Sequence, residues 1–209
     1  MSYGLRLSAV EGNWRLFMKR KADPAFLAFQ NKVFNRDQYT CCFCGFRSKI
    51  GLEVVNVDEN YYNNKLANLV TACPLCAQCF FIESIGQNDF GGGLLIYAKE
   101  MSQAQINALC HVFFSTIVNN LSGSDQARNI YRGLKLRSQL VERYLGESTS
   151  QPTVLGRMII DKSLVTLKSL NSELLGPLRL LPSITYFVLQ IKQWNTEAFQ
   201  LMQEANHGV

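Results

Sequence analysis

Cys41-Cys42-Phe43-Cys44-Gly45 and Cys73-Pro74-Leu75-Cys76 are the two stretches that decide the fold, and Cys79 follows the second one closely. Each stretch contains a Cys-x-x-Cys hook, and two such hooks can place four thiolates on one metal ion. Zinc accepts four thiolates tetrahedrally, and its structural sites use this short ligand spacing. The loop between the hooks is longer than in the commonest paired-hook pattern, but the entropy of closing a loop grows only slowly with its length. The spacing therefore predicts a zinc site.

The sequence leaves open which thiols bind. Cys41 and Cys44 have the right spacing, and Gly45 permits the tight turn of a zinc knuckle. Cys42 and Cys79 are spare thiols, and Cys42 could replace Cys41 only by shortening the first hook. Free cysteines also fill apolar cores well, but two correctly spaced pairs favour a metal. A disulfide framework has less support, because the chain has 7 cysteines, an odd number, and no secretory signal precedes them.

Composition excludes several classes of protein. The 209 residues are 47% hydrophobic and 18% charged, an ordinary balance for a globular chain with a real core. The net charge of +5 falls short of the strongly basic character of a dedicated nucleic-acid binder. No apolar stretch approaches the length of a membrane span. We expect a protein of the reducing cytoplasm that is held at a membrane only by partners.

In the first half, the sequence predicts short elements around the hooks. Residues 5–10 alternate as an edge strand would, and Lys19-Arg20-Lys21 favours a solvated turn over an anion site. Asp23-Pro24 predicts the start of a helix that ends near Arg36-Asp37. Residues 52–57 predict a strand, and residues 77–85 a short helix that Gly86 stops. Structural zinc can contribute roughly 10–16 kcal/mol to such small elements, so we expect a ββα-metal unit.

The second half is predicted to be mainly helical. A strand over residues 94–97 is followed by a helix that Ser102 and Gln105 begin with a capping box. His111 lies within this apolar helix and receives no catalytic role. Residues 126–145 predict one helix with Ile130 toward the core and a basic face that is either solvated or the docking strip of an acidic partner. A last amphipathic helix begins after residue 182.

The predicted fold class is α+β, a degenerate ββα zinc unit followed by a mainly helical C-terminal half. Residues 1–98 form the zinc-containing unit and residues 99–209 the helical region, and the two can pack together as one domain.

The order Arg36-Asp37-Gln38-Tyr39-Thr40-Cys41-x-x-Cys44-Gly45, a strand, and then Asn68 to Cys76 resembles the HNH endonuclease family. Such a nuclease needs a histidine base at the end of the strand and polar ligands for a divalent ion. Val55 and Asn56 stand where its Asp-His pair would be, and Ala77 stands where a His or Asn would be expected. The scaffold therefore looks like a nuclease while the chemistry is missing, and we predict no catalytic residues.

The whole chain is similar to the DotN (IcmJ) family, a component of the Dot/Icm type IVB secretion system. The resemblance rests on residues 1–5 and 10–21, both hooks, residues 77–81, the Gly91-Gly92-Gly93 turn, residues 109–112 and residues 129–132. It implies a non-enzymatic, cytoplasmic subunit of the coupling complex at the inner membrane, in a system for protein transport and virulence. It also implies a structural zinc on Cys41, Cys44, Cys73 and Cys76. The implied partner is the C-terminal extension of the coupling ATPase DotL, on a platform that receives effector proteins for export.

Two other hypotheses compete with this adaptor. A divergent HNH nuclease would use Asp58 and water to hold a catalytic metal. A nucleic-acid-binding protein without catalysis would use Lys19-Arg20-Lys21 and the face that carries Arg128, and its affinity would fall steeply with salt.

Overall fold

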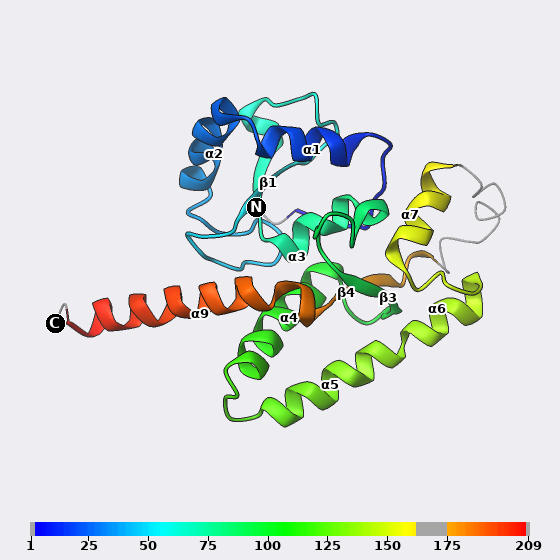
Figure 1. Cartoon of the computed structure of the whole chain (residues 1–209). Coiled ribbons are helices and arrows are strands. Elements are labelled where there is room, and N and C mark those ends of the chain that lie inside the picture. The colour runs from blue at the N-terminus through cyan, green and yellow to red at the C-terminus, as the bar shows by residue number, and fades with distance from the viewer. Residues whose placement is uncertain (1–2, 162–174, 208–209) are drawn as a thin grey trace.

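The computed structural model describes residues 3–161 and 175–207 (Figure 1). The first elements are α1 (Asn13–Lys21), α2 (Pro24–Arg36), β1 (Glu53–Asn56), β2 (Leu69–Ala72) and the short helix α3 (Pro74–Ala77). They are followed by β3 (Gly93–Tyr97), α4 (Gln103–Val118), α5 (Ser124–Leu136), α6 (Ser138–Leu145) and α7 (Pro152–Ile160). The described part ends with β4 (Leu178–Pro182) and α9 (Ile184–His207). The α+β class and the helical character of the second half are confirmed.

Two helix starts follow directly from capping residues. The Asp23 carboxylate accepts a hydrogen bond from the Ala25 N–H at 2.9 Å, and Pro24 opens α2. Ser102 and Gln105 exchange two hydrogen bonds, of 3.2 Å to the Ser102 hydroxyl and 2.8 Å to the Gln105 side chain, at the start of α4. Both predictions of a helix start are confirmed.

A small antiparallel sheet precedes α3. Strands β1 and β2 pair in register from Glu53 opposite Ala72 to Asn56 opposite Leu69, and α3 follows β2 after Cys73. The order is strand, strand, helix, as a ββα unit requires, while the likeness to HNH nucleases stays a prediction. The segment after α3 is not the single predicted helix, because it consists of the two 3-10 turns Gln78–Phe80 and Ile82–Ser84.

A second antiparallel pair, β3 and β4, joins segments about 85 residues apart in sequence. Leu95 and Leu180 face each other at its centre and are fully buried. The side chain of Gln103 binds both the N–H and the C=O of Leu180, each at 2.8 Å, and so fastens β4 to the start of α4. The sequence did not predict β4, because the short, largely apolar run of residues 178–182 does not distinguish a strand from other apolar structure.

Residues before and after position 98 in the sequence contribute to one main apolar core. Phe17 and Phe81 from the first part and Leu95 belong to one cluster with Phe114 of α4 and Ile191 of α9, and all five are almost fully buried. A smaller cluster holds α2 against the first sheet through Val33 and its neighbours. The division of the chain into two units at residue 98 stays a prediction.

Four further local predictions are wrong. Residues 5–10 form no strand, and Lys19-Arg20-Lys21 is the last turn of α1 rather than a solvated turn, with Arg20 buried. The helix predicted over residues 126–145 is broken at Arg137 into α5 and α6. Ile130, which was expected in the core, is 44% exposed. None of these positions carries a Gly or Pro signal that would have marked the change.

The middle of α9 is fastened to the loop that follows the first hook. The Glu197 carboxylate accepts from the Ser48 hydroxyl at 2.5 Å and from the Lys49 N–H at 2.6 Å. The indole N–H of Trp194 donates to the Ile50 carbonyl at 3.1 Å. Beyond these contacts α9 extends away from the rest of the molecule (Figure 1).

Candidate metal centre

Four cysteine sulfurs meet at one point between the two hooks. The Sγ atoms of Cys41, Cys44, Cys73 and Cys76 all lie within 4.8 Å of one another, and the Cys44 and Cys73 sulfurs are 3.6 Å apart. In a tetrahedral site with Zn–S bonds of about 2.3 Å, the sulfurs are about 3.8 Å from one another. The four side chains are therefore spaced to hold a single ion. Within residues 3–161 and 175–207, no other cluster of His, Cys, Asp or Glu meets the same criterion.

The first hook lies in a tight hairpin. Thr40 and Arg47 form an antiparallel bridge, and the Cys41 N–H donates to the Phe46 carbonyl at 2.8 Å. Gly45 has a φ of +77°, a conformation that glycine adopts without strain, and its N–H donates to the Cys41 carbonyl at 3.0 Å. This turn brings the two sulfurs of the hook to the same side, as the zinc-knuckle interpretation requires.

The second hook is built on the start of α3. Pro74 occupies the first helical position, where its missing N–H costs nothing. The N–H groups of Cys76 and Ala77 both donate to the Cys73 carbonyl, at 2.9 and 2.8 Å. One turn of helix thus separates Cys73 from Cys76 and points both sulfurs toward the first hook.

The remaining cysteines lie outside the cluster. All 7 cysteines are free of disulfide bonds. The Cys42 thiol points to the Thr40 carbonyl at 3.9 Å, and the fully buried Cys79 thiol donates to the Leu75 carbonyl at 3.5 Å. Cys110, the seventh, is buried on α4. The geometry therefore separates the four converging thiols from the three others.

Burial makes this cluster dependent on a compensating charge. Desolvation raises the pKa of the Cys73 and Cys76 thiols well above the ordinary value. Hydrogen bonds from the other three cysteines, Cys41 first, lower the pKa of the more exposed Cys44 thiol. Buried thiolates are unfavourable without a cation, and a bound metal ion deprotonates the thiols that ligate it. The donor set fits a soft or borderline cation such as zinc.

Two side chains of α4 touch the cluster. Asn107 Nδ2 lies 3.2 Å from the Cys76 sulfur, and His111 Nε2 lies 3.2 Å from the Cys73 sulfur. The imidazole is stacked on Phe46, with ring centroids 3.8 Å apart. Sequence reasoning set His111 aside as a lone histidine in an apolar helix. The signal that could have found it is the spacing of four residues between two polar side chains, which places them on one face of the helix.

Asn56, at the position expected for a nuclease base, is occupied with structural hydrogen bonds. Its side-chain oxygen accepts from Arg20 Nη1 at 2.6 Å, and its amide donates to the carbonyls of Asn60 and Asn63 at 2.9 and 2.8 Å. The Arg20 guanidinium also donates to the Val54 carbonyl at 2.5 Å. The buried arginine therefore joins α1 to β1 at Asn56, the position where the nuclease resemblance would expect a base.

Asp58, the carboxylate of the divergent-nuclease hypothesis, is exposed and held by its own loop. It accepts hydrogen bonds from the N–H of Asn60 at 2.9 Å and from the side chains of Asn63 and Asn68, both at 2.7 Å. Slight desolvation favours the neutral acid, but these hydrogen bonds prevail and lower the pKa of Asp58. The described structure thus gives Asp58 a role in shaping the loop.

No family model matches the chain. Over 196 residues it is 47% identical to the type 4 apparatus protein DotN of Legionella pneumophila, in a match that covers 94% of this chain and 91% of that relative. The chain belongs to the DotN family. A match of this extent includes both hooks and most of the helical half, so the DotN resemblance seen in the sequence is confirmed. Among the described residues, no helix is long and apolar enough to cross a membrane.

Proposed function

We propose that this member of the DotN family is a non-enzymatic adaptor subunit of a type IVB secretion coupling complex. In this proposal it binds the C-terminal extension of the coupling ATPase DotL and helps to recruit effector proteins for export. The observation that carries the proposal is the 47% identity, over 94% of the chain, to the type 4 apparatus protein DotN. Its place would be the cytoplasmic side of the inner membrane, where partners hold it.

In this proposal the four clustered cysteines hold one structural zinc ion. Four protein ligands fill a tetrahedral shell and leave no open position for water or substrate, which is the arrangement of structural sites. The elements around the cluster are short, since β1 and β2 have 4 residues each and α3 has 4. Zinc would therefore act as part of the core, holding the hairpin of the first hook against α3.

The residues at the nuclease-like position support an adaptor over an enzyme. Asparagine cannot act as a general base at neutral pH, and alanine cannot ligate a cation. Asn56 has all its side-chain groups engaged, and Ala77 is buried behind the second hook. The catalytic divalent ion of a nuclease would need ligands that these two positions do not supply.

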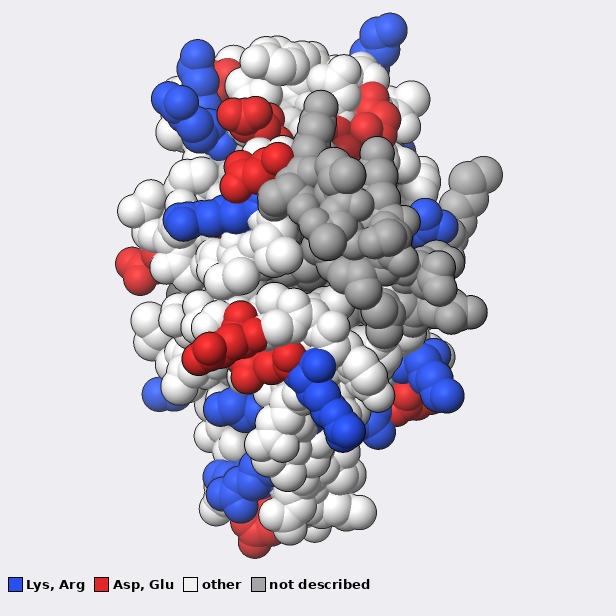
Figure 2. Space-filling model, turned by 90° about the vertical axis from the view of Figure 1, so that its right-hand side faces the viewer, with Lys and Arg blue, Asp and Glu red and all other residues white. Residues whose placement is uncertain are grey.

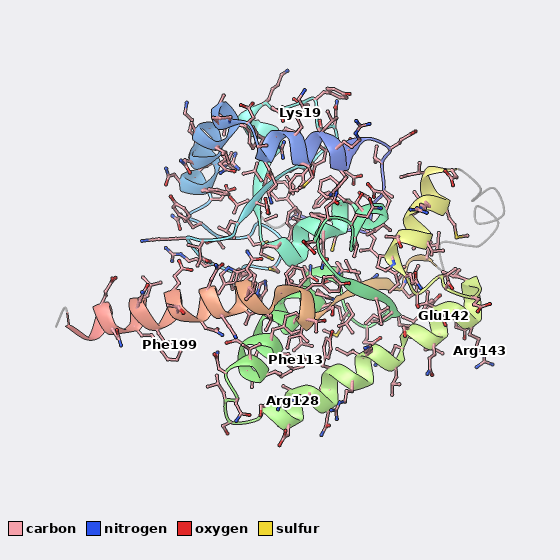
Figure 3. The ribbon with its side chains drawn as sticks, viewed as in Figure 1. Lys19, Phe113, Arg128, Glu142, Arg143 and Phe199 are labelled. Carbon is pink, nitrogen blue, oxygen red and sulfur yellow. The ribbon has the colours of Figure 1, made fainter. Side chains whose placement is uncertain are left out.

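Two exposed surfaces are available to a partner. On α5, Arg132 and Lys135 are exposed, and Lys and Arg are more prominent than Asp and Glu on the lower part of the face shown in Figure 2, where α5 and α6 lie. Figure 3 shows Arg128 near the start of α5, Arg143 near the end of α6 and Phe199 on the extended part of α9. Phe199 is 57% exposed and Met202 63% exposed. A basic helix face and a protruding apolar one suit a subunit that holds other proteins.

The test is binding to the purified C-terminal extension of the coupling ATPase. We expect a complex that co-elutes in size-exclusion chromatography and gives a saturable isotherm in calorimetry. A matched control is the same extension with its sequence scrambled. Separate elution of both proteins, without heat of binding, would contradict the adaptor proposal. Plasmid nicking with Mg²⁺ or Mn²⁺ that Asp58→Ala abolishes would establish the nuclease instead.

A further inference from the structure

We propose that Asn107 and His111 of α4 belong to the metal centre, where their N–H groups donate hydrogen bonds to the sulfurs of Cys76 and Cys73. The inference rests on the proposed zinc site and extends it beyond the four ligands. It makes α4, the first helix of the helical half, the second support of the ion.

Asn107 is held in one orientation. It is fully buried, and its side-chain oxygen accepts from Gln103 Nε2 at 2.9 Å. This leaves the amide nitrogen to face α3, where it lies 3.0 Å from the Leu75 carbonyl and 3.2 Å from the Cys76 sulfur. An amide has two N–H bonds, so it can serve both acceptors at once. Gln103 is itself hydrogen-bonded to the backbone of Leu180, so β4 fixes the orientation of Gln103 and, through it, that of Asn107.

The His111 ring is equally constrained. It stacks on Phe46 with an angle of 2° between the ring planes, and the Trp194 ring lies 5.2 Å away on α9. Its Nε2 is 3.2 Å from the Cys73 sulfur. A thiolate that ligates a metal has no proton and can only accept, so the tautomer with hydrogen on Nε2 is the one that fits the loaded site.

The two donors serve the sulfurs that water cannot reach. Cys73 and Cys76 are fully buried, whereas Cys44 is partly exposed. Four thiolates on a divalent ion leave a net charge of about −2, which hydrogen bonds to the sulfurs spread into the protein. Outer partners of this kind typically contribute a factor of about 10–100 to metal affinity. Asn107 and His111 supply such bonds from adjacent turns of one helix.

The experiment compares His111→Phe with His111→Gln in the full-length, zinc-loaded protein. Phenylalanine keeps a flat ring against Phe46 and beside Trp194 and removes the donor, whereas glutamine restores an N–H. Zinc transfer to a chromophoric chelator gives the rate of metal loss, and the sulfur-to-cobalt charge-transfer band of the Co²⁺ form reports on the sulfurs directly. Val112→Ala is the matched control, because the neighbouring Val112 is 62% exposed.

We expect His111→Phe to release zinc about 10-fold faster and to shift the charge-transfer band, and His111→Gln to recover most of both. Asn107→Leu should act in the same direction through Cys76. Parent-like release and an unshifted band in His111→Phe would overturn the inference while leaving the zinc site intact. Equal effects of the Phe and Gln substitutions would also overturn it, because packing rather than the N–H would then be responsible. A parent protein that binds no zinc would instead refute the metal proposal itself.

Discussion

Replacing Arg20 by methionine tests how the nuclease-like position is held. The guanidinium donates to Asn56 at 2.6 Å, to Val54 at 2.5 Å and to Asn64 at 3.0 Å, and its carbon lies 4.3 Å from the centroid of the Phe26 ring. Methionine keeps much of the packing but leaves the Asn56 and Val54 oxygens buried without donors. Each unsatisfied buried acceptor costs about 1–3 kcal/mol.

Two such acceptors give a gross cost of about 2–6 kcal/mol. Relief of desolvation offsets part of it, because burial is unfavourable for the guanidinium and lowers the pKa of Arg20 to about 10. We therefore expect the free energy of unfolding to fall by about 2–4 kcal/mol, measured by urea denaturation with zinc present. Lys19→Met is the control, since it removes the same charge from an exposed neighbour and should change stability by less than about 0.5 kcal/mol. Equal stability of the two variants would refute the claim that Arg20 holds this position.

Three further predictions concern the metal, a close contact and a buried acid. Cys76→Ser should lose zinc and aggregate, because it removes a buried ligand of the cluster. Cys42→Ser should keep both zinc and solubility. Metal analysis of the soluble fractions distinguishes the two, and equal zinc content in both variants would overturn the ligand assignment. Gly156→Ala should lower the melting temperature, because an added Cβ would lie 2.5 Å from the backbone of Glu83. The control Gly133→Ala has open space in α5 and should raise stability by about 0.5–1 kcal/mol. A calorimetric scan in which both variants are stabilised would contradict the close contact. Burial raises the pKa of Glu83 to about 7, so its proton is held more tightly in the folded state and stability should fall as pH rises from about 4.5 to 7. Glu83→Gln should remove about 1–3 kcal/mol of this fall in urea titrations at pH 5 and 8, and an unchanged pH dependence would show that Glu83 does not cause it.

The sequence predicted those features of the fold that depend on local signals. Asp23 and Ser102 marked the starts of α2 and α4, because a capping side chain acts within its own turn. The hooks predicted a metal cluster for the same reason, since ligand spacing is a local property. The structure brings Cys41, Cys44, Cys73 and Cys76 together as that spacing requires.

Contacts between distant segments could not be predicted in this way. Strand β4 exists because Leu180 pairs with Leu95, and nothing within residues 178–182 distinguishes a strand from other leucine-rich structure. Arg20 looked like part of a solvated basic turn because its acceptors, Asn56 and Val54, lie more than 30 residues away. His111 likewise gains its meaning only from Cys73, which a different element supplies.

Because Glu197 attaches α9 to the loop at Ser48 and Lys49, a movement of the exposed part of α9 is transmitted to that loop. Glu197 is the last polar anchor described on α9, and the helix continues to His207. At about 1.5 Å per residue, this overhang is roughly 15 Å long. A protein that binds this overhang and tilts it would also move the loop at Ser48 and Lys49. Because that loop follows the hairpin of the first hook, such binding would shift the positions of the Cys41 and Cys44 sulfurs.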